Sequence, residues 1–186
     1  MASSPTSGES TQPNRMRIAA WGTAAGLILL PLIAMRFTQD VAWRPGDFVF
    51  ATGLVVGVGI AFEAAVRLTR NSAYRGGAAV ALLAAFLLVW INLAVGIIGS
   101  EDNPANQMYF AVVGVGIVGA LLGRFRAAGM MLALGAMAVA QVAVFVVALA
   151  AGLGFTGPIT VFFTGLWLIS AWLFREAARD SLPLKN

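Results

Sequence analysis

Residues 129–152 read GMMLALGAMAVAQVAVFVVALAAG, an uncharged run whose only polar side chain is that of Gln141. An α-helix needs about 20 predominantly apolar residues to cross the ~30 Å hydrocarbon core of a bilayer. Comparable apolar stretches occur at 18–36, 48–67, 77–98, 108–123 and 158–174. The sequence therefore predicts an all-α, polytopic membrane protein with six transmembrane helices.

The overall composition supports the same class. Of the 186 residues, 60% are apolar and 11% are charged, whereas soluble domains average about 45–50% and about 25%. The mean hydropathy is +0.86. A chain of this length has no room to bury so much apolar surface in water, which excludes a soluble enzyme, a nucleic-acid-binding domain and a disordered protein.

The basic residues predict the orientation. In a six-span topology, ten of the twelve fall on one side: Arg15, Arg17, Arg67, Arg70, Arg75, Arg124, Arg126, Arg175, Arg179 and Lys185. The other side carries Arg36 and Arg44 together with the acidic residues Asp40, Asp47, Glu101 and Asp102. By the positive-inside rule we expect a multi-pass protein of the bacterial inner (cytoplasmic) membrane with both termini in the cytoplasm.

The net charge of +4 is explained by this orientation and by contact with anionic lipid headgroups, without nucleic acid as a partner. The expected headgroup contacts are Arg67, Arg70, Arg75, Arg124 and Arg126. We expect residues 1–15 to be a disordered cytoplasmic tail, 16–180 the six-helix transmembrane bundle, and 181–186 a cytoplasmic C-terminal tail.

Missing residue types exclude several kinds of chemistry. The chain has no Cys and no His, and its single Lys is Lys185. Thiolate metal sites, the usual haem and zinc ligands, the usual general base and an intramembrane Schiff base are therefore unavailable. We expect no enzymatic activity, no cofactor and no metal.

Three of the stretches share a pattern. The string VGVGI occurs at 56–60 and at 113–117, and a Thr-Gly-Leu tripeptide precedes a Phe- and Arg-containing end in both 52–67 and 164–179. The spacing predicts three tandem helical hairpins of about 57 residues. Chance is the alternative, because Gly, Val and Ala are common in every stretch.

Small residues four apart suggest close helix packing. Gly22 and Gly26, Gly53 and Gly57, and Gly119 and Gly123 have this spacing. Such pairs let helix backbones approach each other in lipid. We expect them to pack helices within one bundle, with a homodimer seam as the alternative. A homo-oligomer, or an accessory subunit of a membrane complex, is thus possible.

Three polar residues within the stretches form a candidate intramembrane polar site: Glu63, Asn92 and Gln141. Glu63 lies near the cytoplasmic end of its helix, four residues before Arg67, which favours an interfacial ion pair over a proton or cation site. Asn92 and Gln141 are expected in one layer of the outer half. They would form an interhelical hydrogen bond or, alternatively, line a cavity that opens outward.

The segment 99–106, GSEDNPAN, is the most distinctive loop. Its oxygen-rich side chains, Glu101, Asp102 and Asn103 among them, resemble a Ca²⁺ ligand set. Helix capping explains the same residues without a metal, with Asn103 as N-cap and Pro104 as the first helical residue. Capping is the favoured interpretation, because the spacing of an EF-hand is absent.

The stretch 90–110, WINLAVGIIGSEDNPANQMYF, is similar to a signature of small bacterial six-helix integral membrane proteins with a GIIGSEDNPAN-type loop and no assigned activity. Residues 113–130 and 164–179 resemble the same group. The resemblance implies an inner-membrane protein and transfers no catalytic residue. The layout, without any residue motif, also resembles that of enterobacterial acid-resistance membrane proteins.

These observations favour an inner-membrane protein with a structural, accessory or stress-related role. The alternative is a small-solute or ion transporter or channel with a polar cavity near Asn92 and Gln141. A membrane enzyme acting on lipid is a third possibility, for which Glu101 and Asp102 are the candidate acids.

Overall fold

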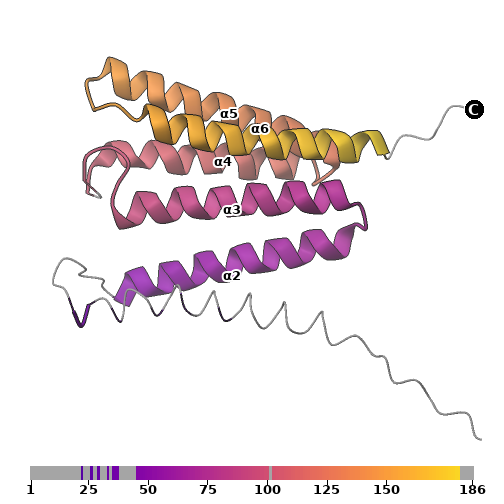
Figure 1. Ribbon diagram of the computed structural model, residues 1–186, viewed down its shortest axis with the longest axis horizontal. Helices are drawn as coiled ribbons and strands as arrows, with labels where there is room; N and C mark the ends of the chain where they lie inside the picture. The colour runs from indigo at the N-terminus through magenta and orange to yellow at the C-terminus, as the bar shows by residue number, and fades with distance from the viewer. Residues whose placement is uncertain are drawn as a thin grey trace, which may run out of the picture. The chain divides into compact units, whose positions relative to one another are not determined.

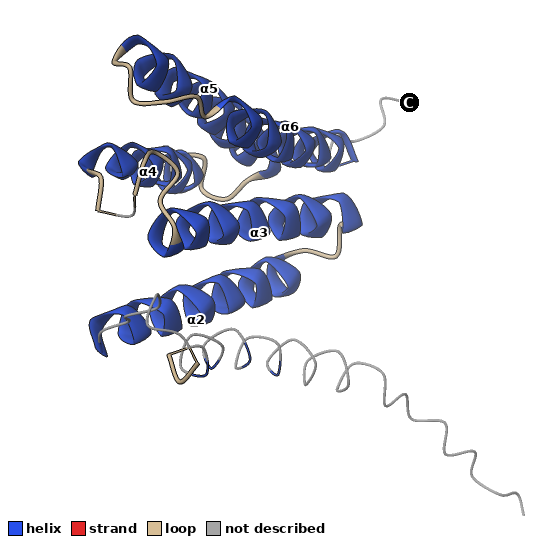
Figure 2. Ribbon diagram, turned by 60° about the vertical axis from the view of Figure 1, so that its left-hand side comes forward, coloured by secondary structure: helices blue, strands red, loops and turns tan. Residues whose placement is uncertain are grey.

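The structure is a computed structural model that describes residues 45–100 and 102–180, with isolated positions at 22, 26, 29, 33 and 35–37. Within these ranges it is helical and contains no strand (Figure 1, Figure 2). The elements are α2 (Pro45–Leu68), α3 (Ser72–Ala94), the short 3₁₀ helix η1 (Pro104–Asn106), α4 (Gln107–Leu122), α5 (Ala127–Ala150) and α6 (Gly157–Asp180).

The described residues contain five helical segments long and apolar enough to cross a membrane, with mean hydropathies between 1.6 and 2.4. The chain therefore has the character of a multi-pass integral membrane protein, as the sequence predicts. The predicted first span, 18–36, and the two predicted tails, 1–15 and 181–186, lie outside the described residues apart from the isolated positions. The chain divides into two compact units, Met1–Val55 and Val56–Asn186.

Helix α3 begins earlier than the sequence suggests because Asn71 caps it. The Asn71 Oδ1 accepts a hydrogen bond from the backbone N–H of Tyr74 at 2.9 Å, which satisfies one of the otherwise unpaired donors of the first turn. The predicted stretch begins at residue 77, but the helix begins at Ser72, so Gly76 and Gly77 both lie inside it. Glycine in a helix interior has a modest cost that packing can offset.

Helix α4 ends in a tight turn that leads directly into α5. Arg124 and Phe125 adopt positive φ values of 50° and 56°, and the N–H of Phe125 donates to the Ala120 carbonyl at 2.9 Å. This is the hydrogen-bond pattern of a Schellman motif. Two successive non-glycine residues in this backbone region are uncommon, so the surrounding packing must stabilise the turn.

The second unit has its core where α3, α4, α5 and α6 meet. Helix α5 packs on α4 and on α6, and α6 also packs on α3, while α3 and α4 touch only loosely. Buried positions in α5 and α6 alternate three and four residues apart: Leu134, Met137, Gln141, Val144 and Ala148, and Thr160, Phe163, Trp167, Ser170, Phe174 and Ala177. This is the spacing of a coiled-coil seam.

Small residues bring α4 and α5 into backbone contact. A Cβ added to Gly119 would lie 2.6 Å from the Cβ of Ala133, and one added to Gly129 would lie 2.5 Å from the Cα of Gly123. Gly119 and Gly123 thus pack two helices of one bundle, which is the favoured of the two interpretations of their spacing.

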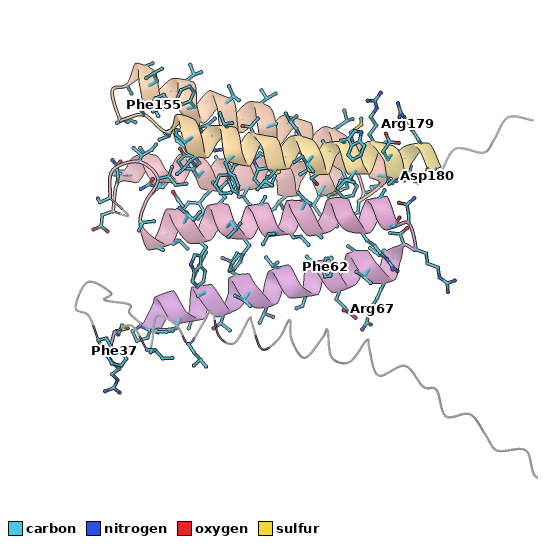
Figure 3. The ribbon with its side chains drawn as sticks, viewed as in Figure 1. Phe37, Phe62, Arg67, Phe155, Arg179 and Asp180 are labelled. Atoms are coloured by element: carbon cyan, nitrogen blue, oxygen red, sulfur yellow. The ribbon has the colours of Figure 1, made fainter. Side chains whose placement is uncertain are left out.

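The two ends of the bundle differ in chemistry. One end, called here the arginine end, is formed by the starts of α3 and α5 and the ends of α4 and α6, with Arg70, Arg75, Arg124, Arg126, Arg175 and Arg179. The opposite end, the polar-loop end, is formed by residues 95–106 and 151–156. In Figure 3, Arg179 and Asp180 mark the arginine end of α6 and Phe155 marks the polar-loop end.

Candidate functional site

The loop at the polar-loop end is built around the buried side chain of Asn106. Its Oδ1 accepts hydrogen bonds from the N–H groups of Ile97 and Ile98 at 3.1 and 2.8 Å. Its Nδ2 donates to the carbonyls of Ile98 and Ser100 at 3.3 and 2.7 Å. One amide therefore satisfies four backbone groups, and the loop holds Ile98 in the core, where it is fully buried.

Asn103 and Pro104 play the capping roles that the sequence predicts. The Asn103 Oδ1 accepts from the N–H of Ala105 at 3.0 Å, and Pro104 follows as the first residue of η1. Asp102 is exposed, and Glu101 lies outside the described residues. In the described part of the chain, no three His, Cys, Asp or Glu side chains gather as metal ligands. The loop geometry thus supports capping.

Asn92 lies close to the polar-loop end of α3 and is bound to this loop. Its Nδ2 donates to the Asn106 carbonyl at 3.0 Å, while its Oδ1 is buried without a partner in the protein. Asn92 thus bonds to the backbone carbonyl of Asn106, and this is not the hydrogen bond to another spanning helix that the sequence predicts.

The hydroxyls of Thr156 and Tyr109 lie at about the same depth in the bundle as Asn92. The reference point is the hydrogen bond that joins α6 to α3, in which the Ser170 hydroxyl donates to the Gly77 carbonyl at 2.7 Å. Asn92 lies 15 residues after Gly77, and Thr156 lies 14 residues before Ser170. At ~1.5 Å per residue along antiparallel helices, Asn92 and Thr156 both lie about 21–23 Å from that bond. The Tyr109 hydroxyl approaches Thr156, although neither hydroxyl has a hydrogen bond of good geometry.

Gln141 lies deeper, in the seam between α5 and α6. It is nine residues before the end of α5, and Trp167 is ten residues after the start of α6, so both lie about 14–15 Å below the polar-loop ends of their helices. Both side chains have an exposed fraction of 0%. The Gln141 amide atoms, the Trp167 Nε1 and the nearby Thr164 hydroxyl have no partner in the protein.

Asn92 and Gln141 therefore lie in different layers. Asn92 is two residues from the end of α3, or about 3 Å along the helix, against about 14 Å for Gln141. They also sit on α3 and α5, which do not pack directly on each other. The expected shared layer is absent from the described bundle.

Glu63 forms the interfacial ion pair expected from its spacing. Its Oε1 accepts a hydrogen bond from Nε of Arg67 at 2.9 Å and lies 2.9 Å from Nη2 of the same guanidinium. The side chains are 42% and 71% exposed. Glu176 and Arg179 form a similar pair at 2.9 Å near the end of α6.

We expect Glu63→Gln to change the free energy of unfolding by no more than about 0.5 kcal/mol, because exposed ion pairs one helical turn apart contribute little. Thermal unfolding in detergent at low and high salt is the measurement. A loss of several degrees in Tm that persists in high salt would contradict the surface-pair assignment.

The five arginines predicted to contact lipid headgroups fall into two groups. Arg75 donates from Nε to the Thr69 carbonyl at 2.8 Å and from Nη2 to the Val66 carbonyl at 2.7 Å. It thus caps the end of α2, and Arg67 is paired with Glu63. Arg70, Arg124 and Arg126 are exposed at the arginine end.

Sequence reasoning missed Asn106, Tyr109 and Thr156 as parts of the polar interior. The position of Asn106 could have been noticed in the sequence, because it lies one turn after the N-cap Asn103, in a helix that begins at Pro104. Tyr109 and Thr156 gave none, because Tyr and Thr are common near helix ends.

The chain matches no protein-family model, no curated protein and no solved structure.

Proposed function

We propose that this chain is a non-enzymatic, multi-pass protein of the bacterial inner membrane with a structural, accessory or stress-related role. The observation that supports this proposal best is the separation of the three candidate polar residues. Glu63 is in an exposed ion pair, Asn92 is bound to a loop carbonyl, and Gln141 is sealed in the α5–α6 seam. A transporter or channel needs polar groups that share one route.

Packing at the arginine end also argues against a through-route. The buried Phe174 ring meets the ring of Tyr74 edge-on with centroids 4.8 Å apart. The Tyr74 hydroxyl donates to the Phe125 carbonyl at 2.6 Å. These contacts join α3, α6 and the α4–α5 turn, so the bundle interior is closed at this end.

Flux measurements on the reconstituted protein test this role against the transporter alternative. We expect vesicles containing the protein to conduct protons, K⁺ and small neutral solutes no faster than empty vesicles. Flux above that background, abolished by Gln141→Leu, would establish the transporter.

The proposed orientation places the arginine end in the cytoplasm. At that end of α3 to α6 the chain has six arginines and two acids, Glu176 and Asp180, whereas the described part of the polar-loop end carries the acid Asp102 and no basic residue. The positive-inside rule then puts both termini of a six-span chain in the cytoplasm, and Arg70, Arg124 and Arg126 within reach of anionic lipid headgroups.

The six-span count and the three-hairpin repeat are part of this proposal. The matching Glu–Arg pairs at the ends of α2 and α6 support the repeat. The shorter α4, with 16 residues against 24 in α2 and α6, departs from it. Membership of the group with the GIIGSEDNPAN-type loop rests on residues 90–110, whose described central part, 95–100 and 102–106, forms the compact loop described above.

Reporter fusions test the orientation. We expect a periplasm-active reporter to be active when fused after Asn103 and inactive when fused after Arg126, because the two loops lie at opposite ends of α4. Equal activity at both positions would refute the topology. Reversed activities would refute only the placement of the arginine end in the cytoplasm.

A further inference from the structure

Seven buried side-chain atoms in the described bundle lack a hydrogen bond of good geometry to another protein atom, although two of them, the Tyr109 and Thr156 hydroxyls, approach each other. They are Asn92 Oδ1, Tyr109 Oη, Gln141 Nε2, Gln141 Oε1, Thr156 Oγ1, Thr164 Oγ1 and Trp167 Nε1. They come from α3, α4, α5, α6 and the residue that precedes α6.

So many unpaired atoms are too costly to remain unsatisfied. A buried polar group without a partner costs about 1–3 kcal/mol, and seven would consume a stability of 5–15 kcal/mol, which is the usual range for a folded protein. The lipid phase offers no partner either. The interior therefore has to supply partners that are not protein atoms.

The unpaired atoms gather in two layers. The outer layer contains Asn92, Tyr109 and Thr156 at the polar-loop end, one from each of three separate chain segments. The inner layer, about 12–16 Å deeper along α6, contains Gln141, Thr164 and Trp167. Thr160 lies between the layers, and its hydroxyl is already bonded to the Thr156 carbonyl at 2.9 Å.

The side chains determine what can bind. Amides, hydroxyls and an indole N–H provide donors and acceptors and carry no charge. The charged side chains of α3 to α6 lie at the arginine end, so an ion in the inner layer would lack a counter-charge. Water makes two to four hydrogen bonds at such buried sites, and the three or four unpaired atoms in each layer fit this number.

We infer that the bundle interior binds water at these two polar layers. The contact of Phe174 with Tyr74 and Gly77 closes the arginine end, where a Cβ on Gly77 would lie 3.0 Å from the Phe174 ring. The layers are thus binding sites without a route to that end. This inference goes beyond the proposed role and holds whether or not that role is correct.

Water contact at Trp167 tests the inner layer directly. The experiment uses the full chain in lipid bilayers with ¹⁵N-labelled Trp indoles and water-edited solid-state NMR, with Trp167→Phe to assign the signal. We expect the Trp167 N–H signal to build up from water magnetisation at short mixing times. If the Trp167 N–H signal shows no build-up from water and its chemical shift changes in Gln141→Leu, Gln141 bonds directly to Trp167. That result would overturn the inference for this layer.

Hydroxyl deletions test the outer layer. If Tyr109 and Thr156 bind a shared water, the labelled Tyr109 ring should build up signal from water magnetisation, and Tyr109→Phe and Thr156→Val should each lower Tm, with a double variant that loses less than the sum. The same coupling without water contact at Tyr109 would mean that the two hydroxyls bond directly, and would overturn the inference for this layer. The control is Thr160→Val, whose hydroxyl has a protein partner, so its effect on Tm should add to that of Tyr109→Phe. Higher Tm in both single variants would mean that the hydroxyls are unsatisfied, and would overturn the inference.

Discussion

Replacing Gly129 by Ala is expected to destabilise the protein by about 1–3 kcal/mol, or more if α4 and α5 must separate. The added methyl would meet the Cα of Gly123 at 2.5 Å and its carbonyl oxygen at 2.8 Å. These are backbone atoms, which cannot rotate away as a flexible side chain would. Relief requires α4 and α5 to move apart, which forfeits the neighbouring contact of Gly119 with Ala133. Overpacking of a rigid interior costs 1–3 kcal/mol and occasionally more.

The measurement is the thermal unfolding and monodispersity of the purified variant in detergent. Gly135→Ala is the matched control, because it places the same change in the same helix where nothing lies within 4 Å of the new methyl. The free energy of unfolding of Gly135→Ala should equal that of the parent or exceed it by up to about 1 kcal/mol, because Ala favours a helix more than Gly does. Equal behaviour of the two variants would refute the close α4–α5 contact.

The second large effect is expected for Asn106→Ala. The substitution removes the partner of four backbone groups around Ile98 at once and leaves a small cavity. Each buried group left unpaired costs about 1–3 kcal/mol, so we expect a loss of roughly 3 kcal/mol or more. Because the affected groups are in a loop, residues 95–103 should also become the first site of proteolytic cleavage.

Limited proteolysis with identification of the first cleavage site, together with Tm, measures this effect. Asp102→Ala serves as the control, because its side chain is exposed in the same loop. If Asn106→Ala keeps the parental Tm and cleavage pattern, the hydrogen bonds of Asn106 do not hold the loop.

The spans were predictable because apolar length is a property of consecutive residues. The boundaries were less so: α3 starts at Ser72 because the single cap of Asn71 outweighs the helix-breaking tendency of Gly76 and Gly77. The role of those glycines became clear only from the partner, since the Phe174 ring occupies the space that a side chain at Gly77 would fill.

The polar interior was predictable in part. Gln141 is visible in any reading of 129–152 as the one polar residue in a long apolar run. Its depth relative to Asn92 depends on which helices are neighbours, and that is a long-range property. The pairing of α3 with α6, which places Thr156 level with Asn92, leaves no local trace in the sequence.

That pairing also sets an order of assembly. Helix α3 has little contact with α4, the next long helix in the chain, and packs mainly on α6, the third long helix after it. During synthesis, the face of α3 that contains Gly77 remains exposed to lipid until α6, with Ser170 and Phe174, has been inserted. The bundle cannot be completed hairpin by hairpin, and a chain interrupted before α6 would present an open helix face to membrane proteases.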